Sequence, residues 1–248
     1  MSSDVESMHA AAEQPLRPAG WRARLADYGR AVGAVVWKDL AAEMRSRELI
    51  SAMLVFSLLV VLIFNFALEL DRFARENVAA GVLWVTFIFA GTLGLNRTFA
   101  AEKDRGSFDG LLLAPVDRTV IYFGKLLATM IFMLIVEAIV IPVFSVLYGL
   151  SLFQPLLFVV VLLGTLGYAG VGTLLATMSA NTRLRDVLLP ILLLPVALPA
   201  LLAAVKSTAG ALDSTPLEFW SNWLALLAAY DLALVGLAFL TFDFIVED

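Results

Sequence analysis

The sequence predicts an all-α polytopic membrane protein, in which six transmembrane helices follow an amphipathic interfacial helix. Hydrophobic residues make up 61% of the 248 residues and charged residues only 16%, with a mean hydropathy of +0.90. Soluble domains are about 45–50% apolar, so a water-soluble fold could not bury this much apolar surface. The apolar residues are also gathered into runs of about 20 residues, the length that a helix needs to cross a bilayer. Because the runs are continuous and do not alternate, a helix is the structure that satisfies their peptide groups in lipid.

Six runs with little or no charge supply the predicted spans. They cover residues 49–68, 78–96, 121–149, 156–180, 187–205 and 223–242. Together they form one transmembrane domain over residues 49–242. We expect a disordered tail over residues 1–20, an interfacial helix over 21–48 and an acidic tail over 243–248.

Basic residues predict the orientation of these spans. Fourteen of the 17 Lys and Arg residues lie before the first span, between spans two and three, or between spans four and five. Only Arg72, Arg75 and Lys206 fall on the other side. Because loops rich in Lys and Arg stay in the cytoplasm, both termini of this multi-pass protein are predicted to be cytoplasmic.

The segment before the first span has helical periodicity. Apolar residues recur every three or four positions, at Trp21, Leu25, Tyr28, Val32, Val36, Leu40 and Met44. Basic residues occupy other positions around the helix. This pattern predicts an amphipathic helix on the inner membrane face, with a soluble helix that packs on a partner as the alternative.

Composition excludes several functions. The net charge of −5 gives no basic surface for nucleic acid. The chain has no cysteine, and its one histidine is His9, so Cys/His metal sites and thiol chemistry are excluded. The pair Gly124-Lys125 lacks the rest of a phosphate-binding loop. We therefore expect no catalytic residue and no metal site, and an intramembrane enzyme built on Glu137 and Asp231 is disfavoured because it would lack a nucleophile and a histidine base.

The loop between spans two and three carries the densest charge. Acids and bases alternate from Glu102 through Asp104 to Arg105. Gly106 then ends the helix, and Ser107 can begin a short new one. The apolar residues and the end of this short helix are Phe108, Leu111, Leu112 and Pro115. Such a helix suits a groove on another protein, and a solvated connector is the equally supported alternative.

Three polar residues lie inside the predicted spans. Glu137 is near the middle of span three, where a lone carboxylate must pair, take up a proton or face water. We favour a functional role for Glu137. Asp231 and Asn65 are as readily explained by structural hydrogen bonds between helices.

Glycines and prolines mark the fourth and fifth spans. Gly164, Gly167, Gly170 and Gly172 predict a smooth strip against which another helix packs closely. Pro190, Pro195 and Pro199 each remove an amide donor, so they predict a kinked fifth span. The kinks would serve either a change of shape or a static bend.

Several of these segments resemble one known family. The matching residues are Lys38-Asp39-Leu40, Arg45 to Glu48, Gly81 to Trp84, Glu102 to Phe108, Leu111 to Pro115, Gly124-Lys125, Leu166 to Tyr168, Asn181, Leu189 to Pro195 and Pro199. The loop motif alone is typical of ABC-2 permeases in general, whereas the combination resembles the CcmB family. The resemblance covers about residues 35–205.

The resemblance implies a non-catalytic permease subunit of a haem exporter, or cytochrome c maturation system, in the bacterial inner membrane. Residues 102–115 would be the coupling helix, seated on a separate CcmA-like ATPase that binds the ATP, and residues 21–48 the elbow helix. Other implied partners are CcmC-like, CcmD-like and CcmE-like haem-handling proteins, a second copy of this chain and membrane lipid. Haem would be cargo and not a cofactor of this chain. An ABC-2 permease for a lipid, a drug or a polysaccharide is the alternative.

Overall fold

The computed structural model describes residues 21–67, 72–104, 118–179, 185–213 and 215–245, and it is built from helices. These are α2 (Trp21–Ser46), α3 (Glu48–Ala67), α4 (Arg72–Asp104), α6 (Arg118–Tyr148), α7 (Pro155–Ser179), α8 (Arg185–Leu212), the 3-10 turn η1 (Leu217–Phe219) and α9 (Ser221–Ile245). The helices α3, α4, α6, α7, α8 and α9 each contain a stretch long and apolar enough to cross a membrane. The predicted all-α class with six spanning helices is confirmed. The predicted tail over residues 1–20 lies outside the described residues. Of the predicted acidic tail over 243–248, the first three residues belong to α9 and the last three lie outside the described residues.

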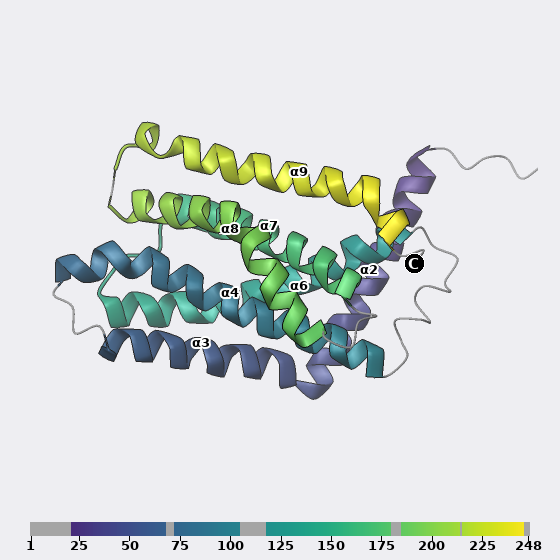
Figure 1. Ribbon diagram of the computed structural model, residues 1–248, viewed down its shortest axis with the longest axis horizontal. Coiled ribbons are helices and arrows are strands. Elements are labelled where there is room, and N and C mark those ends of the chain that lie inside the picture. The colour runs from purple at the N-terminus through teal and green to yellow at the C-terminus, as the bar shows by residue number, and fades with distance from the viewer. Residues whose placement is uncertain (1–20, 68–71, 105–117, 180–184, 214, 246–248) are drawn as a thin grey trace, which may run out of the picture.

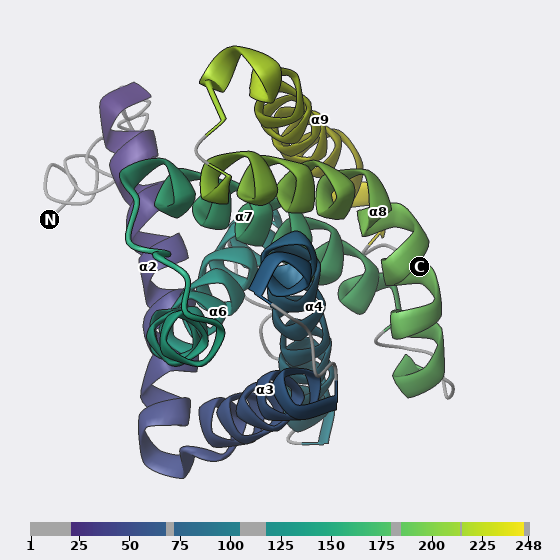
Figure 2. The same ribbon diagram turned by 90° about the vertical axis from the view of Figure 1, so that its left-hand side faces the viewer.

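The six long helices form a bundle, and α2 crosses one end of it (Figure 1). In Figure 2 several of the spans are seen nearly along their axes, while α2 lies across the view beside α6. We call this end of the bundle, where α2, the start of α3, the end of α4 and the start of α6 gather, the α2 end. At the centre, α7 packs against α4, α6, α8 and α9. The helices α4 and α7 are the most enclosed spans, whereas α3 and α9 bury the smallest share of their residues.

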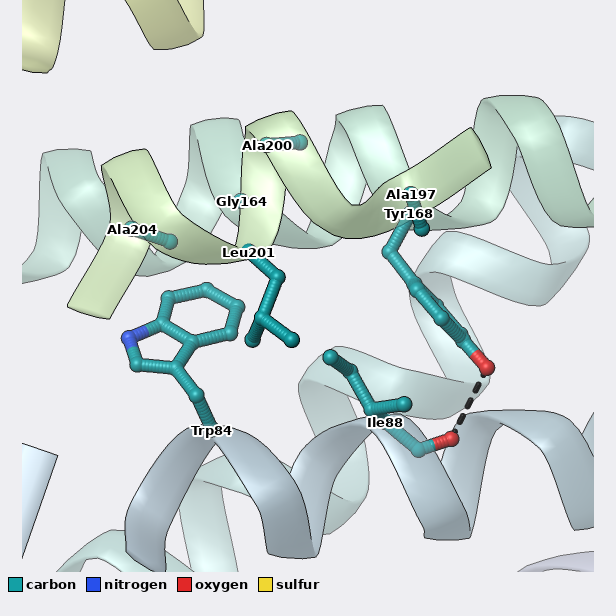
Figure 3. Close-up of a pocket in the computed structure, with 8 residues that line it drawn as sticks. All are labelled: Trp84, Ile88, Gly164, Tyr168, Ala197, Ala200, Leu201 and Ala204. Atoms are coloured by element: carbon teal, nitrogen blue, oxygen red, sulfur yellow. Dashed lines mark hydrogen bonds between the residues drawn. The ribbon is translucent and has the colours of Figure 1, made fainter. Parts of the chain in front are cut away.

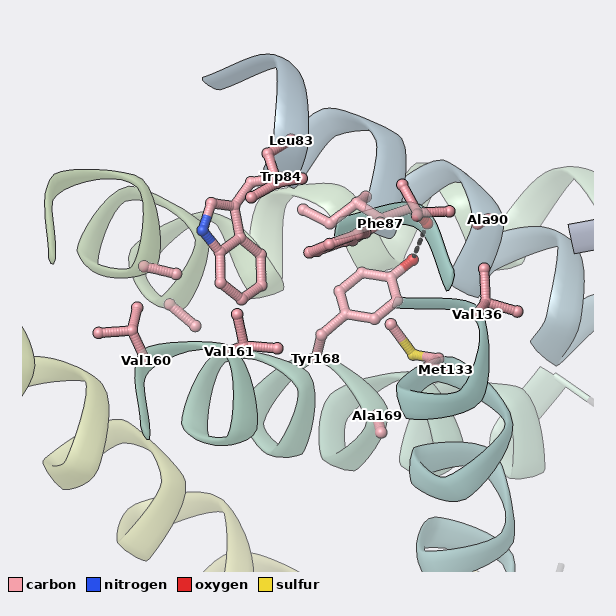
Figure 4. Packing of buried hydrophobic residues seen from close by; sticks show 14 of the residues in the cluster. Leu83, Trp84, Phe87, Ala90, Met133, Val136, Val160, Val161, Tyr168 and Ala169 are labelled. Atoms are coloured by element: carbon pink, nitrogen blue, oxygen red, sulfur yellow. Dashed lines mark hydrogen bonds between the residues drawn. The ribbon is translucent and has the colours of Figure 1, made fainter. Parts of the chain in front are cut away.

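The centre of the bundle is held by aromatic side chains between α4 and α7 (Figure 4). The Trp84 indole meets the ring of Phe87 edge to face, with the centroids 5.7 Å apart. The Tyr168 hydroxyl donates to the carbonyl of Ile88 at 2.9 Å and lies 2.6 Å from the hydroxyl of Thr92. These contacts satisfy the one polar atom of a large buried ring, so Tyr168 joins α7 to α4 without an unpaired hydroxyl.

The four glycines of α7 do not form one strip, and that expectation is wrong. A Cβ added at each glycine would have a different nearest neighbour; in chain order these are Trp84, Asp231, Leu126 and Leu95. The reason is helical geometry, because a step of three residues turns by about 300°, so the glycines spread around the helix. The structure uses them to bring three different helices, α4, α6 and α9, close to α7.

All three prolines of the fifth span lie inside α8, which stays one helix from Arg185 to Leu212. The helix bends along its length in both views (Figures 1 and 2). It also runs seven residues beyond the predicted end of the span at residue 205. Lys206 ends the apolar run in the sequence. Its side chain is exposed in the structure, so the helix can continue past this charge.

Candidate functional site

Of the residues predicted to couple to an ATPase, the two that the structure describes fall at the α2 end. Glu102 and Asp104 belong to the last turn of α4, which continues well past the predicted span. The predicted short helix lies outside the described residues, and with it lie Arg105, Gly106, Ser107, Phe108, Leu111, Leu112 and Pro115. The structure therefore describes the two helices that flank this segment, α4 before it and α6 after it.

The helix α2 packs along the first turns of α6 with a face that partly coincides with the apolar face predicted for it. The buried residues of α2 are Val32, Val35, Asp39 and Glu43. Leu25 and Met44, which the periodicity placed on the apolar face, are exposed, as is Trp37. Of the other predicted apolar positions, Val32 is buried and Tyr28, Val36 and Leu40 are half-buried. Two carboxylates are buried beside them, and a pattern of apolar residues cannot reveal these.

A buried ion pair anchors α2 on α6. The Lys125 ammonium lies 2.8 Å from a carboxylate oxygen of Asp39, and the two side chains are only 1% and 7% exposed. The exposed ammonium of Lys38 lies 3.3 Å from the other oxygen of Asp39. Lys125 was counted above among the loop residues, but it lies inside α6. Buried charges are costly unless they are paired, so this pair fixes where α2 sits.

Two further contacts bring α2 close to α6. A Cβ added at Gly124 would lie 2.6 Å from the Cβ of Val35, closer than two carbon atoms can approach. About two turns earlier in α2, the Tyr28 hydroxyl donates to the Thr119 hydroxyl at 3.1 Å. Gly124 thus allows the two helices to touch beside the ion pair, in the way that small residues allow close helix crossings in membranes.

A sharp turn joins α2 to α3. Arg47 has a φ of 55°, a left-handed conformation that is strained for a residue with a side chain. The Glu43 carboxylate accepts a hydrogen bond from the backbone amide of Ile50 at 2.9 Å, which satisfies a free donor at the start of α3. From α4, the Arg97 guanidinium donates to the carbonyl of Glu48 at 3.1 Å. The turn is therefore held by α2 on one side and by α4 on the other.

Glu137 is buried between α6 and α7. Its side chain is 2% exposed, and both carboxylate oxygens lie within hydrogen-bond distance of the Thr165 hydroxyl, at 2.8 and 3.0 Å. A single hydroxyl can donate one proton, so it satisfies only part of the carboxyl group. Among the described residues, this hydroxyl is the one donor that the structure gives to Glu137.

Asp231 is buried where α9 meets α7. It is 5% exposed, and neither of its oxygens has a hydrogen-bond partner among the described residues. A Cβ at Gly167 would lie 2.5 Å from one of them, so this glycine makes room for the carboxyl group. The next residue, Tyr230, reaches α8 and donates to the carbonyl of Val196 at 2.7 Å. This contact ties α9 to the proline-containing helix.

The third predicted polar residue, Asn65, makes no bond between helices in the described structure. Its side-chain oxygen is buried without a hydrogen-bond partner near the end of α3. Among the described residues, no group of three or more His, Cys, Asp or Glu side chains is placed to hold a metal ion.

An apolar crevice lies between α4, α7 and α8 (Figure 3). Its walls are Trp84, Ile88, Gly164, Tyr168, Ala197, Ala200, Leu201 and Ala204. The Trp84 indole N–H donates to the Thr208 hydroxyl on α8 at 2.9 Å, so its polar edge is satisfied on the side facing α8. The small residues that α8 presents here let the bent helix approach the two central spans.

Sequence reasoning missed the Asp39–Lys125 pair, Glu43 and Thr165. A signal for the pair was present, because a lysine two turns inside a long apolar run needs a counter-charge nearby. Glu43 bonds an amide at the start of α3, only seven residues away. This role could have been predicted, because a carboxylate just before a helix often accepts hydrogen bonds from its first amides. Nothing in the sequence pairs Thr165 with Glu137, since their contact depends on how α6 and α7 are rotated.

Comparison with known proteins agrees with this architecture. Residues 30–246 match the family described as CcmB protein. Heme exporter protein B of Rhodobacter capsulatus is 30% identical over 206 residues, which cover 83% of this chain and 94% of that protein. The protein of the same name from Paracoccus denitrificans is 30% identical over 210 residues, covering 83% of this chain and 93% of the relative. That of Pseudomonas aeruginosa is 27% identical over 186 residues, covering 75% and 83%. With six spanning helices and a match over most of its length, this chain belongs to the CcmB protein family.

Proposed function

We propose that this chain is the membrane permease subunit of an ABC transporter for haem export in the bacterial inner membrane. ATP is hydrolysed by a separate ATPase subunit, and this chain couples that hydrolysis to haem transfer or to release of a haem chaperone. Haem is cargo, and the chain itself carries out no catalysis. Both termini face the cytoplasm.

The observation that carries the proposal is the similarity to three proteins named Heme exporter protein B, each aligned over at least three quarters of this chain. One further feature supports it. The α2 end carries most of the basic residues, as expected for a cytoplasmic face that meets an ATPase.

The coupling contact is assigned to residues 102–115, which begin in the last turn of α4. Its partners are a CcmA-like ATPase on the cytoplasmic side, CcmC-like, CcmD-like and CcmE-like haem-handling proteins, and a second copy of this chain. The charged residues Glu102 and Asp104 orient the contact, and the apolar side chain of Phe108 fills a groove in the ATPase.

The test combines charge reversal at Glu102 and Asp104 with Phe108→Ala. We expect this variant to remain in the membrane but to lose the ATPase in a pull-down from gentle detergent. A matched control reverses Asp213 and Glu218 and replaces Phe219, three exposed residues in and beside η1 at the opposite end of the bundle. The control variant should retain the ATPase.

Two outcomes would contradict the proposal. If the loop variant still binds the ATPase and leaves its activity unchanged, the coupling contact lies elsewhere. If the wild-type chain co-purifies with an ATPase but with no haem and no haem chaperone, the substrate is not haem. The chain is then a permease subunit for a lipid, a drug or a polysaccharide.

A further inference from the structure

The helices α2 and α3, which follow each other directly in the chain, contact the two helices that flank the proposed coupling segment. On the side of α6, the Asp39 carboxylate pairs with Lys125, seven residues after α6 begins at Arg118. On the side of α4, Arg97 lies seven residues before that helix ends at Asp104. Arg97 donates to the first residue of α3, just beyond the turn that follows α2. The segment between α4 and α6 therefore begins after a helix bonded to the start of α3 and ends at a helix paired with α2.

The contact between α2 and α6 is also difficult to open. Separating the helices would leave the 1%-exposed Lys125 ammonium without its carboxylate partner, and a buried charge that loses its partner is strongly destabilising. It would also uncover Val32 and Val35, which pack with Val120 of α6 in a small cluster of their own. The turn from α2 to α3 is similarly fixed, because Glu43 on α2 holds the amide of Ile50 on α3.

We propose that α2 is a rigid brace, and that the Asp39–Lys125 ion pair makes it move together with the start of α6. A displacement of the coupling segment then shifts α6, α2 and the start of α3 as one body, with α4 following through Arg97. Asp39 and Lys125 are positioning residues, since they act by holding helices and touch no cargo. This inference rests on the proposed function, which places the ATPase contact between α4 and α6.

The first test asks whether the ion pair holds α2 in place, and it needs no ATPase. The chain has no cysteine, so a single Val35→Cys substitution gives one thiol in the buried contact between α2 and α6. We expect slow labelling of this thiol by a maleimide in the otherwise wild-type chain, and labelling at least several-fold faster when Asp39→Asn is added. The control is Asp27→Asn, which breaks the exposed pair of Asp27 with Arg30 on the same helix. Equal labelling in all three proteins would overturn the proposal.

The second test asks whether the brace carries coupling. In the complex with its ATPase and haem-handling partners, haem delivered per ATP hydrolysed should fall roughly 2- to 30-fold in Asp39→Asn, the range expected when one element of a coupling network is loosened. The ATPase should remain bound, and Asp27→Asn should leave the ratio unchanged. If Asp39→Asn couples as well as the wild type, the brace is overturned, whereas a wild-type chain that binds no ATPase overturns the proposed function instead.

A disulfide provides the decisive control against simple misfolding. In a Val35→Cys, Gly124→Cys variant the two Cβ atoms start about 2.6 Å apart, and a disulfide needs roughly 3.5–4.5 Å, so a small outward shift of α2 allows the bond. If α2 never leaves α6 during the cycle, the oxidised chain should remain fully coupled. The disulfide should also restore coupling to Asp39→Asn and lose that effect on reduction. Loss of coupling on oxidation of the otherwise wild-type chain would show that α2 must detach, which refutes the brace.

Discussion

The contact between Gly164 and Trp84 offers a sharp test of the packing at the centre of the bundle. In Gly164→Ala the new Cβ would overlap the Cη2 atom of the indole and lie 2.7 and 2.8 Å from Cζ3 and Cζ2. The indole cannot easily retreat, because it is 1% exposed and its N–H is bonded to Thr208. The substitution must therefore push α7 away from α4 or turn the indole out of its place.

The expected magnitude follows from three terms. Overpacking a tight core costs about 1–3 kcal/mol. A lost Trp84–Thr208 hydrogen bond costs about 1 kcal/mol more. Alanine in place of glycine inside a helix gains about 1 kcal/mol, which offsets the second term. The net loss of about 1–3 kcal/mol corresponds to a melting temperature lower by roughly 2–12 °C for a chain of this length.

The assay is thermal unfolding of the purified protein in detergent, followed by intrinsic fluorescence. Gly81→Ala is the matched control, because it lies on the same helix as Trp84 and a Cβ there meets nothing within 4 Å. It should raise the melting temperature by roughly 2–4 °C. Trp84→Phe should relieve most of the loss in Gly164→Ala, since phenylalanine lacks the outer ring of the indole. A Gly164→Ala protein as stable as the wild type would refute this account of the packing.

Four further predictions concern single side chains. Thr165→Val removes the donor to Glu137 and should lower the stability by about 1–3 kcal/mol in the same thermal assay, whereas Thr165→Ser, which keeps the hydroxyl, should not. Glu137→Gln should express normally yet reduce haem delivery by the complex; unchanged delivery would leave Glu137 with a packing role. Arg47→Gly should raise the melting temperature by roughly 2–4 °C, because glycine adopts the left-handed conformation without strain, while Arg47→Ala should not. Tyr230→Phe removes the bond to the Val196 carbonyl and should cost only about 0.6 kcal/mol, so a large loss of stability would mean that this contact does more than tie two helices.

The spans could be predicted because each depends on a local property of the chain. An apolar run of about 20 residues is helical in lipid whatever its neighbours are, so the six runs matched six helices. Their ends were less predictable, as α8 shows. Lys206 limits the apolar run, but a helix continues past a charge once its side chain reaches a polar surface, and α8 runs on to Leu212.

The arrangement of the helices around one another could not be predicted in the same way. The face of α2 was assigned from apolar periodicity, yet its centre is Asp39, which is buried because Lys125 lies opposite it. The two residues are 86 positions apart, so neither one shows the other in the sequence. The glycines of α7 were recognised as packing residues, but their partners depend on rotations that only the folded bundle defines.

The separation of Asp39 from Lys125 also has a consequence for how the protein is made. At about 5–20 residues per second, a ribosome needs roughly 4–17 s to add the 86 residues between them. During that interval α2 is complete but its binding partner does not yet exist. The helix α2 must wait while α3 and α4 are made, and it can take its final position only when the start of α6 follows.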